Sequence, residues 1–188
     1  MSEPTSAVLP VLETPRLRLR EIRDGDAASL FVLHGDARVM RYWSSSAWTD
    51  PAQAQELLQR LRRDRAAGAM PWAIATRGDD ALIGTVTLFN ISETHRRAEI
   101  GYALASAQWG RGLASEALRA VLHHAFDAMQ LERVEADTDP RNESSLRMLA
   151  RLGFQREGLL RRRWFVADEW CDSAWFGLLR EDFAERPV

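Results

Sequence analysis

A short glycine loop between a predicted strand and a long predicted helix constrains the fold of this chain more than any other feature. The loop is Trp109-Gly110-Arg111-Gly112-Leu113-Ala114, and residues 113–129 carry apolar side chains on one helical face. Glycines allow a tight turn and a close backbone approach, and the first N–H groups of a helix lack partners inside the helix. Their partial positive charge suits a diphosphate. A Gly-x-Gly pair alone is equally consistent with a plain turn into a helix.

Two other phosphate-binding loops do not match this segment. A nucleotide P-loop needs a Gly-Lys-Ser/Thr ending, and the sequence contains no lysine. A dinucleotide-binding loop needs a third glycine where Ser115 stands, and it opens a longer parallel array than the remaining chain can supply. Neither a P-loop nor a dinucleotide site is therefore expected.

The remaining pattern predicts a mixed α/β fold. Asp24 can cap a first helix, and Thr49-Asp50-Pro51 begins a second helix that Gly68 ends. A later helix is predicted for residues 142–152. Alternating or continuous apolar runs predict strands at residues 16–20, 72–76, 81–90, 98–104, 134–138, 159–166 and 170–178. A central meander followed by strand–helix alternation implies a mixed sheet with helices on both faces.

Length, charge and cysteine content narrow the class of protein. We expect a loose arm over Met1 to Glu13 and a single domain over residues 14–188. The net charge of −2 argues against a protein that coats nucleic acid, and no apolar run is long enough to span a membrane. One cysteine, Cys171, cannot form an internal disulfide, and no histidines have the spacing of metal ligands. A cytoplasmic protein without a metal, a membrane partner or a nucleic-acid partner is expected.

The motifs together resemble the GNAT superfamily of acetyltransferases. The glycine loop, Asn142-Glu143-Ser144-Ser145 and Leu152-Gly153-Phe154 carry this resemblance. The segments at residues 14–17, 98–102 and 178–183 are similar to the RimJ/RimL amino-terminal acetyltransferases of ribosomal proteins. The resemblance covers roughly residues 14 to 183. Trp109 departs from the Gln or Arg of the wider superfamily, although tryptophan is familiar there in the RimJ/RimL-like branch.

The resemblance implies the GNAT fold and acetyl-coenzyme A as co-substrate. This fold has a central, mostly antiparallel sheet of about seven strands, flanked by helices and splayed between the fourth and fifth strands, here 98–104 and 134–138. The pantetheine arm would lie in that gap, where a backbone N–H would also polarise the thioester carbonyl. The residues that the resemblance assigns to the cofactor are Tyr102, Ala103, Leu104, Trp109, Gly110, Arg111, Gly112, Leu113, Ala114 and Asn142.

Two residues are candidates for proton transfer by the same resemblance. Glu99 lies in the strand before the loop and would act as the base, directly or through water. The alternative is a sheet carboxylate paired with an arginine such as Arg97. Ser145 would act as the acid beside the sulfur of coenzyme A, where many GNAT enzymes use a tyrosine. The alternative is that Ser145 only hydrogen-bonds the cofactor or the helix start.

The acceptor side is predicted less sharply. In related folds the region that corresponds to residues 41–48 forms one side of the acceptor-binding site. Tyr42, Trp43 and Trp48 are therefore candidates for a lid over the acceptor. The alternative is that these aromatic residues anchor the loop to the core. The run Arg161-Arg162-Arg163 is expected to be a solvated face, or else to contact an acidic acceptor or the cofactor's phosphate.

We expect direct attack of an amine on the thioester in a ternary complex. An N-terminal α-amine, with a pKa of roughly 7.7–8.0, is about one-tenth neutral at pH 7, whereas a lysine amine is neutral in only about one molecule in 2,500. A protein N-terminus, of the ribosomal type, is therefore the leading acceptor. One alternative is a small amine: a polyamine, amino acid, aminoglycoside or other toxic amine. Another is a coenzyme A-binding module without turnover. A monomer and a homodimer are both compatible with the sequence.

Overall fold

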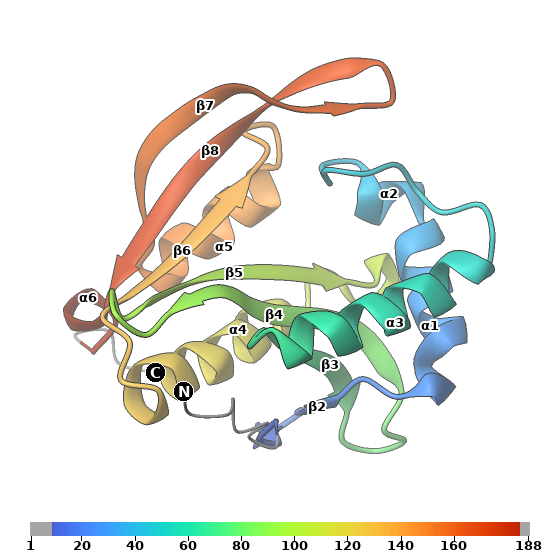
Figure 1. The fold of residues 1–188 in the computed structure, drawn as a ribbon, viewed down its shortest axis with the longest axis horizontal. Coiled ribbons are helices and arrows are strands. Elements are labelled where there is room, and N and C mark those ends of the chain that lie inside the picture. Colours follow the sequence, from blue (N-terminus) through green and yellow to red (C-terminus); the bar gives the residue numbers. More distant parts are fainter. Residues whose placement is uncertain (1–8, 185–188) are drawn as a thin grey trace.

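The computed structural model of the chain describes residues 9–184, whose strands form one sheet (Figure 1). The strand order is β1-β2-β3-β4-β5-β6-β8-β7, and the β5–β6 pair is parallel while the other described pairs are antiparallel. The predicted mixed, mostly antiparallel sheet is confirmed, with eight strands in place of about seven. The strands are β1 Leu12–Glu13, β2 Leu17–Glu21, β3 Met70–Thr76, β4 Leu82–Ser92, β5 Arg97–Leu104, β6 Arg133–Thr138, β7 Gln155–Val166 and β8 Glu169–Leu179.

Helices cover both faces of the sheet, as the pattern predicted (Figure 1). One apolar cluster joins strand residues to α1 (Ala27–Gly35), α2 (Ala37–Met40) and α3 (Ala52–Ala66). A larger cluster joins the sheet to α4 (Leu113–His123) and α5 (Glu143–Leu152). A short helix, α6 (Arg180–Ala184), follows β8. No helix in the described part of the chain is long and apolar enough to cross a bilayer.

Several residues that the sequence assigned to a loose arm belong to the core and the sheet. The arm was expected to extend through Glu13, and its residues 1–8 lie outside the described residues. Leu9, however, is buried in the larger core cluster, and β1 pairs with β2 through Leu12↔Leu19 and Glu13↔Arg18. These contacts join residues that are near neighbours in space but that show little periodicity in the sequence.

Two helix ends also differ from the prediction. Asp24 was expected to cap the first helix, but it lies in a 3-10 turn, Asp24–Asp26, and forms an ion pair with Arg62. The helix that was predicted to run to Met129 changes at His124–Ala128 into a π-helical turn. Gly68 and Gly153, by contrast, follow α3 and α5 with positive φ angles of 97° and 103°, so the glycine stop signals are confirmed.

The gap between β5 and β6 lies where the resemblance placed it. Their parallel pairing covers three registers and ends at Glu99↔Glu135. β5 then continues to Leu104 along β4, while β6 continues to Thr138 along β8. Figure 1 shows the two strands diverging from this point. The predicted splay between residues 98–104 and 134–138 is therefore confirmed.

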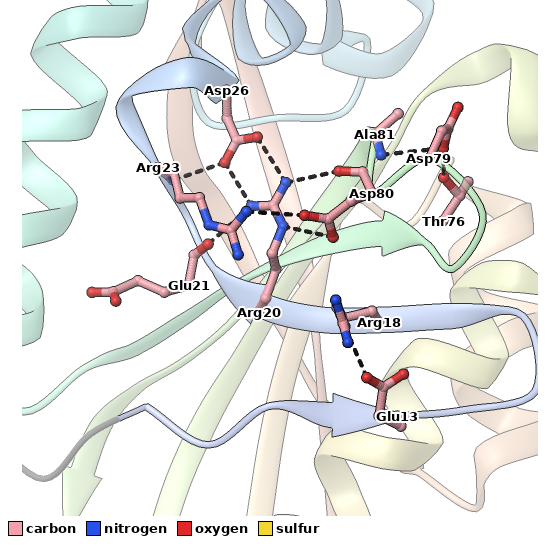
Figure 2. Close-up of polar contacts among 10 residues, drawn as sticks. All are labelled: Glu13, Arg18, Arg20, Glu21, Arg23, Asp26, Thr76, Asp79, Asp80 and Ala81. Atoms are coloured by element: carbon pink, nitrogen blue, oxygen red, sulfur yellow. Dashed lines mark hydrogen bonds and ion pairs between the residues drawn. The ribbon is translucent and has the colours of Figure 1, made fainter.

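A buried cluster of charged residues joins β2 and the 3-10 turn after it to the turn between β3 and β4. Arg20 of β2 is 4% exposed, and its five N–H groups all have acceptors (Figure 2). Two bonds go to the Asp26 carboxylate, one to the Asp80 carboxylate, and two to the carbonyls of Glu21 and Asp80. The backbone N–H of Arg23 also donates to Asp26, at 2.7 Å. Each buried charge is therefore paired and hydrogen-bonded, as burial requires.

Candidate functional site

The glycine loop forms one wall of a cavity of about 980 Å³, which we call the loop cavity. Gly110 and Gly112 have φ angles of 74° and 75°, a left-handed conformation that residues with a Cβ rarely adopt. The first backbone bond of α4 runs from the Glu116 N–H to the Gly112 carbonyl, at 3.0 Å. The N–H groups of residues 113–115 therefore precede the helical ladder and are available to a ligand.

The loop cavity is predominantly basic. Its charged lining consists of one carboxylate, Glu116, and four arginines: Arg38, Arg41, Arg119 and Arg151. Glu116 is itself paired with Arg16, at 2.6 Å. Basic side chains around a helix N-terminus favour a ligand that carries several negative charges, such as a polyphosphate.

Most residues that the sequence assigned to the cofactor line this cavity. The set is Tyr102, Ala103, Leu104, Trp109, Gly110, Gly112, Leu113, Ala114 and Asn142. Arg111 does not line it, and its guanidinium donates to the Gln108 side chain. The N–H of Trp109 is also engaged, since it donates to the Ser106 carbonyl at 3.2 Å. Within residues 109–114, the Trp109 N–H is therefore already engaged inside the protein, and the assignment of this span to the cofactor stays a prediction.

A second cavity of about 580 Å³ lies between the residues after α2 and the β7–β8 hairpin, and we call it the hairpin cavity. Seven residues line both cavities: Ala37, Arg41, Tyr42, Trp43, Tyr102, Asn142 and Ser145. The two cavities therefore meet at the gap between β5 and β6, where Tyr102 and Ser145 stand. Two ligands that enter from opposite sides can make contact at this point.

Glu99 lies at the last paired register before that gap and lines the hairpin cavity. Its Oε1 accepts a hydrogen bond from the Asn90 side-chain amide, at 2.9 Å. Asn90 occupies a bulge of β4, with a φ angle of 48° and a register shift between Phe89 and Ser92. Arg97, the suggested alternative partner, instead binds Glu135 at 2.7 Å. Among the described residues, the Glu99 carboxylate thus faces the hairpin cavity with an amide rather than an arginine as its hydrogen-bond donor.

Ser145 and Tyr102 form a close hydroxyl pair, with their oxygens 2.6 Å apart. Ser145 is 7% exposed and lies in the first turn of α5, where the Asn142 Oδ1 caps the helix by accepting its N–H. Burial is the main cause that raises the pKa of Tyr102 to about 12; the bond to Ser145 acts in the opposite direction and the charge of Asp137 in the same direction as burial. Tyr102 therefore keeps its proton at neutral pH and can donate it.

The predicted aromatic lid divides into two parts. Tyr42 and Trp43 line both cavities. Trp48 lines neither and stacks on His34, with ring centroids 4.5 Å apart. Burial, with the charge of Arg60, lowers the pKa of His34 to about 4, so this ring is neutral at pH 7. Trp48 thus packs on His34 and not at either cavity, which is the placement that the anchoring alternative expects.

The hairpin cavity is predominantly acidic. Of its five carboxylates, Asp139 and Glu169 form ion pairs with Arg141. The other three accept hydrogen bonds from neutral donors: Glu99 from Asn90, Asp137 from the Ser173 hydroxyl, and Asp172 from the backbone N–H of Arg162. Arg41 and Arg163 are the arginines of the lining. The arginine run of residues 161–163 is exposed throughout, and Arg163 alone of the three reaches this cavity.

Several residues of the site gave no usable signal in the sequence. Asn90 was assigned only to a strand end, and the bulge that turns it toward Glu99 depends on pairing with β5. Tyr102 was assigned to the cofactor, but its hydroxyl contact with Ser145 crosses 43 residues. Asp137 belongs to a predicted strand, and only the sheet register could have placed its side chain beside the cavity.

Comparison with known proteins gives consistent matches. The model of the acetyltransferase (GNAT) domain matches residues 16–155. The p20 protein of Bacillus licheniformis, named as an uncharacterized N-acetyltransferase, is 34% identical, over 94% of this chain and 99% of its own length. The spermidine N(1)-acetyltransferase of Escherichia coli K12 is 26% identical, over 84% of this chain and 82% of its own length. The structure of Mycobacterium smegmatis RimJ with CoA-disulfide superposes with a TM-score of 0.83 at 28% identity, covering 94% of this chain and 90% of that one.

Proposed function

Because the chain belongs to the GNAT acetyltransferase family, we propose that it transfers the acetyl group of acetyl-coenzyme A to a primary amine that carries further positive charge. The chain is an acetyl-coenzyme A-dependent N-acetyltransferase. What the proposal adds is the class of acceptor and the roles of individual side chains. The observation that carries it is the junction of a basic cavity and an acidic cavity at Tyr102 and Ser145, with Glu99 lining the acidic cavity.

The residues of the loop cavity fit acetyl-coenzyme A. Gly112 brings a backbone without a side chain to the cavity wall, and a Cβ added there would be in ordinary contact with the Arg16 Nη2, at 3.6 Å. The phosphates would be held by the N–H groups that open α4, with Arg41 and Arg119 supplying positive charge. The edge of β5 beyond Glu99 is unpaired with β6 and can bind the amides of the pantetheine arm.

The side chains at the junction can move the two protons that the reaction requires. As the amine nitrogen forms its bond to the acetyl carbon, Glu99 accepts a proton from that nitrogen, directly or through a water molecule. As the carbon–sulfur bond breaks, the Ser145 hydroxyl donates a proton to the sulfur, and the Tyr102 hydroxyl replaces it. The 2.6 Å contact supports this relay, because a serine hydroxyl alone is a poor acid.

Removing the hydroxyl pair tests the acid. Ser145→Ala is expected to lower kcat about 100-fold, which is the usual size of one proton-transfer contribution. Tyr102→Phe should lower kcat less, about tenfold, because Ser145 remains beside the sulfur without its proton source. Steady-state kinetics with acetyl-coenzyme A at saturation measure both effects. Full activity of Ser145→Ala would remove this residue from the chemistry.

Removing the carboxylate of Glu99 tests the base. Glu99→Gln is expected to lower turnover at pH 7 about 100-fold, with partial recovery toward pH 9, because the acceptor amine then loses its proton to the solvent unaided. The matched control is Glu135→Gln, which removes the neighbouring sheet carboxylate outside the hairpin cavity. That variant should keep the pH profile of the wild type. A Glu99→Gln profile of unchanged shape and height would show that the base lies elsewhere.

The acidic lining favours a polycationic small amine. Asp137 and Asp172 face the cavity with neutral hydrogen-bond donors and not with an ion-pair partner, so a second ammonium group can pair with them. An acceptor with one positive charge would add no second cation to this lining, in which Arg41 and Arg163 are the arginines. Spermidine, the acceptor named for the Escherichia coli relative, has this chemistry.

The second candidate is the α-amine of a protein N-terminus, which the sequence favoured. It is supported by the likeness to RimJ and by the higher neutral fraction of an α-amine at pH 7. A basic residue near the N-terminus of such a substrate would also complement the acidic lining. The two candidates differ in whether the second positive charge is required.

A thiol-release assay with acetyl-coenzyme A distinguishes the candidates. The acceptors would be spermidine, putrescine, the monoamine butylamine, and peptides with free or blocked Ser, Ala or Thr termini. We expect kcat/KM for spermidine to exceed that for butylamine by at least about tenfold, the effect of one charge-assisted contact. Release with free-ended peptides alone would instead support the N-terminal function. No release with any amine, while coenzyme A still binds in calorimetry, would favour a binding module and overturn the proposal.

A further inference from the structure

The side chain of Arg16 contacts the glycine loop, although the two lie 95 residues apart in the sequence. It directly precedes β2, and its side chain is half exposed, yet it contacts α4 and the loop before it. Its Nε and Nη2 both bind the Glu116 carboxylate, at 2.6 Å, and its Nη1 donates to the Arg111 carbonyl, at 2.8 Å. The guanidinium thus joins residue 111, inside the loop, to residue 116, in the first turn of the helix.

Glu116 is held in place for this contact. Its side chain is 15% exposed and accepts bonds from the Thr14 hydroxyl, at 2.6 Å, and from the Arg16 backbone N–H, at 3.0 Å. Burial raises the pKa of this carboxyl, but the bonds from Thr14 and Arg16 outweigh burial and hold the pKa below its usual value. We call Arg16, Glu116 and the Arg111 carbonyl the arginine clamp.

The arginine clamp determines which way one peptide unit faces. The carbonyl of residue 111 and the N–H of Gly112 belong to the same planar trans peptide, so they point in opposite directions. Arg16 holds the carbonyl on its own side, and Arg16 and Arg111 are absent from the lining of the loop cavity, whereas Gly112 is part of it. The N–H of Gly112 is thereby turned toward the loop cavity.

We propose that Arg16 is a positioning residue for phosphate binding, which acts through the Arg111–Gly112 peptide and sets the affinity for the diphosphate of acetyl-coenzyme A. This inference rests on the proposed function only in naming the loop cavity as the coenzyme A site. Arg16 does not touch the ligand. Arg16 is half exposed, and Glu116 keeps the bonds from the Thr14 hydroxyl and the backbone N–H of residue 16 when the arginine side chain is replaced, so the replacement should cost the fold little.

The test compares Arg16→Gln with Arg18→Gln. Arg18 lies two residues further along the chain and pairs with Glu13, at 2.8 Å, away from the loop (Figure 2). Arg16→Gln is expected to raise KM for acetyl-coenzyme A about tenfold, the loss of one charge-assisted hydrogen bond, with kcat at saturation nearly unchanged. Its kcat/KM for acetyl-pantetheine, which lacks the diphosphate, should equal that of the wild type. Arg18→Gln should resemble the wild type with both substrates.

Binding measurements separate the clamp from the proposed reaction. Calorimetry with coenzyme A should show the same tenfold weakening in Arg16→Gln, whether or not an acceptor has been found. Arg16→Lys, which keeps the charge but cannot span both partners, should be weakened as well. Equal losses on acetyl-coenzyme A and acetyl-pantetheine, or unchanged coenzyme A affinity in Arg16→Gln, would overturn the inference while leaving the acetyltransferase function intact. Wild-type protein that fails to bind coenzyme A would overturn both.

Discussion

Gly112→Glu is expected to weaken coenzyme A binding by at least about 100-fold, with the fold retained. The left-handed backbone at Gly112 costs a residue with a Cβ about 1–2 kcal/mol, so the loop should relax and displace the N–H groups beside it. The new carboxylate would also compete for those N–H groups and repel the phosphates, by about 4 kcal/mol for charges about 4 Å apart near a protein surface. Calorimetry with coenzyme A measures the loss directly.

Two further variants separate strain from charge in this prediction. Gly68 also has a positive φ angle, of 97°, and an added Cβ there meets no atom within 4 Å. Gly68→Glu therefore introduces the same charge and similar strain at the end of α3, and it should leave coenzyme A affinity unchanged. Gly112→Ala introduces the strain alone and should weaken binding by about tenfold. If Gly112→Glu binds coenzyme A within about threefold of the wild type, the loop does not hold the phosphates.

Arg20→Met is expected to destabilise the fold by about 3–5 kcal/mol, because it leaves the buried carboxylate of Asp26 without its positive partner. That loss is large against the usual stability of a domain, about 5–15 kcal/mol. In a chain of this length it corresponds to a fall in Tm of about 10 °C. Arg18→Met, which breaks the exposed pair with Glu13, should change Tm by no more than about 3 °C (Figure 2).

The destabilisation should depend on pH in a defined direction. Burial raises the pKa of Asp26, but the bonds from Arg20 and from the Arg23 N–H outweigh it and hold the pKa below its ordinary value of 3.8. The wild type therefore gains stability above about pH 4 and loses it as the pH falls through the folded-state pKa of Asp26. Without Arg20, burial raises that pKa, so the variant loses stability as the pH rises above about 4.

Denaturant unfolding at pH 7 and pH 4 checks this sign. The difference between wild type and Arg20→Met should be larger at pH 7 than at pH 4. The double variant Arg20→Met/Asp26→Leu should recover much of the loss, because an apolar pair of similar volume often replaces a buried ion pair without cost. A difference that grows toward low pH would contradict the role assigned to Asp26.

The sequence was informative wherever the signal is local. Three kinds of signal depend only on residues that are near one another in the sequence. They are the apolar face of residues 113–129, the glycines at 110 and 112, and the helix stops at Gly68 and Gly153. These signals located the glycine loop and the helices α3, α4 and α5. The order of the predicted strands and helices then indicated a mixed sheet. The resemblance then located the gap between the strands at residues 98–104 and 134–138.

The contacts that complete the site are not local. Ser145 meets Tyr102 across 43 residues, and Arg16 meets Glu116 across 100 residues, because the sheet brings β2, α4, β5 and α5 together. The periodic spacing of apolar residues in the sequence does not indicate which distant residues will form such pairs. The role of Trp48 was ambiguous for the same reason, since stacking on His34 and lining an acceptor call for the same residue type.

By itself, the sequence determined the main order of strands and helices and the position of the glycine loop, because backbone conformation there follows from glycine, capping residues and apolar spacing. Only the tertiary structure decided which charges remain unpaired. It neutralised Glu135 with Arg97 and left Glu99, Asp137 and Asp172 facing one cavity with neutral donors. Charge pairing depends on distances between side chains, and those distances are fixed by strand register and helix packing rather than by position along the chain.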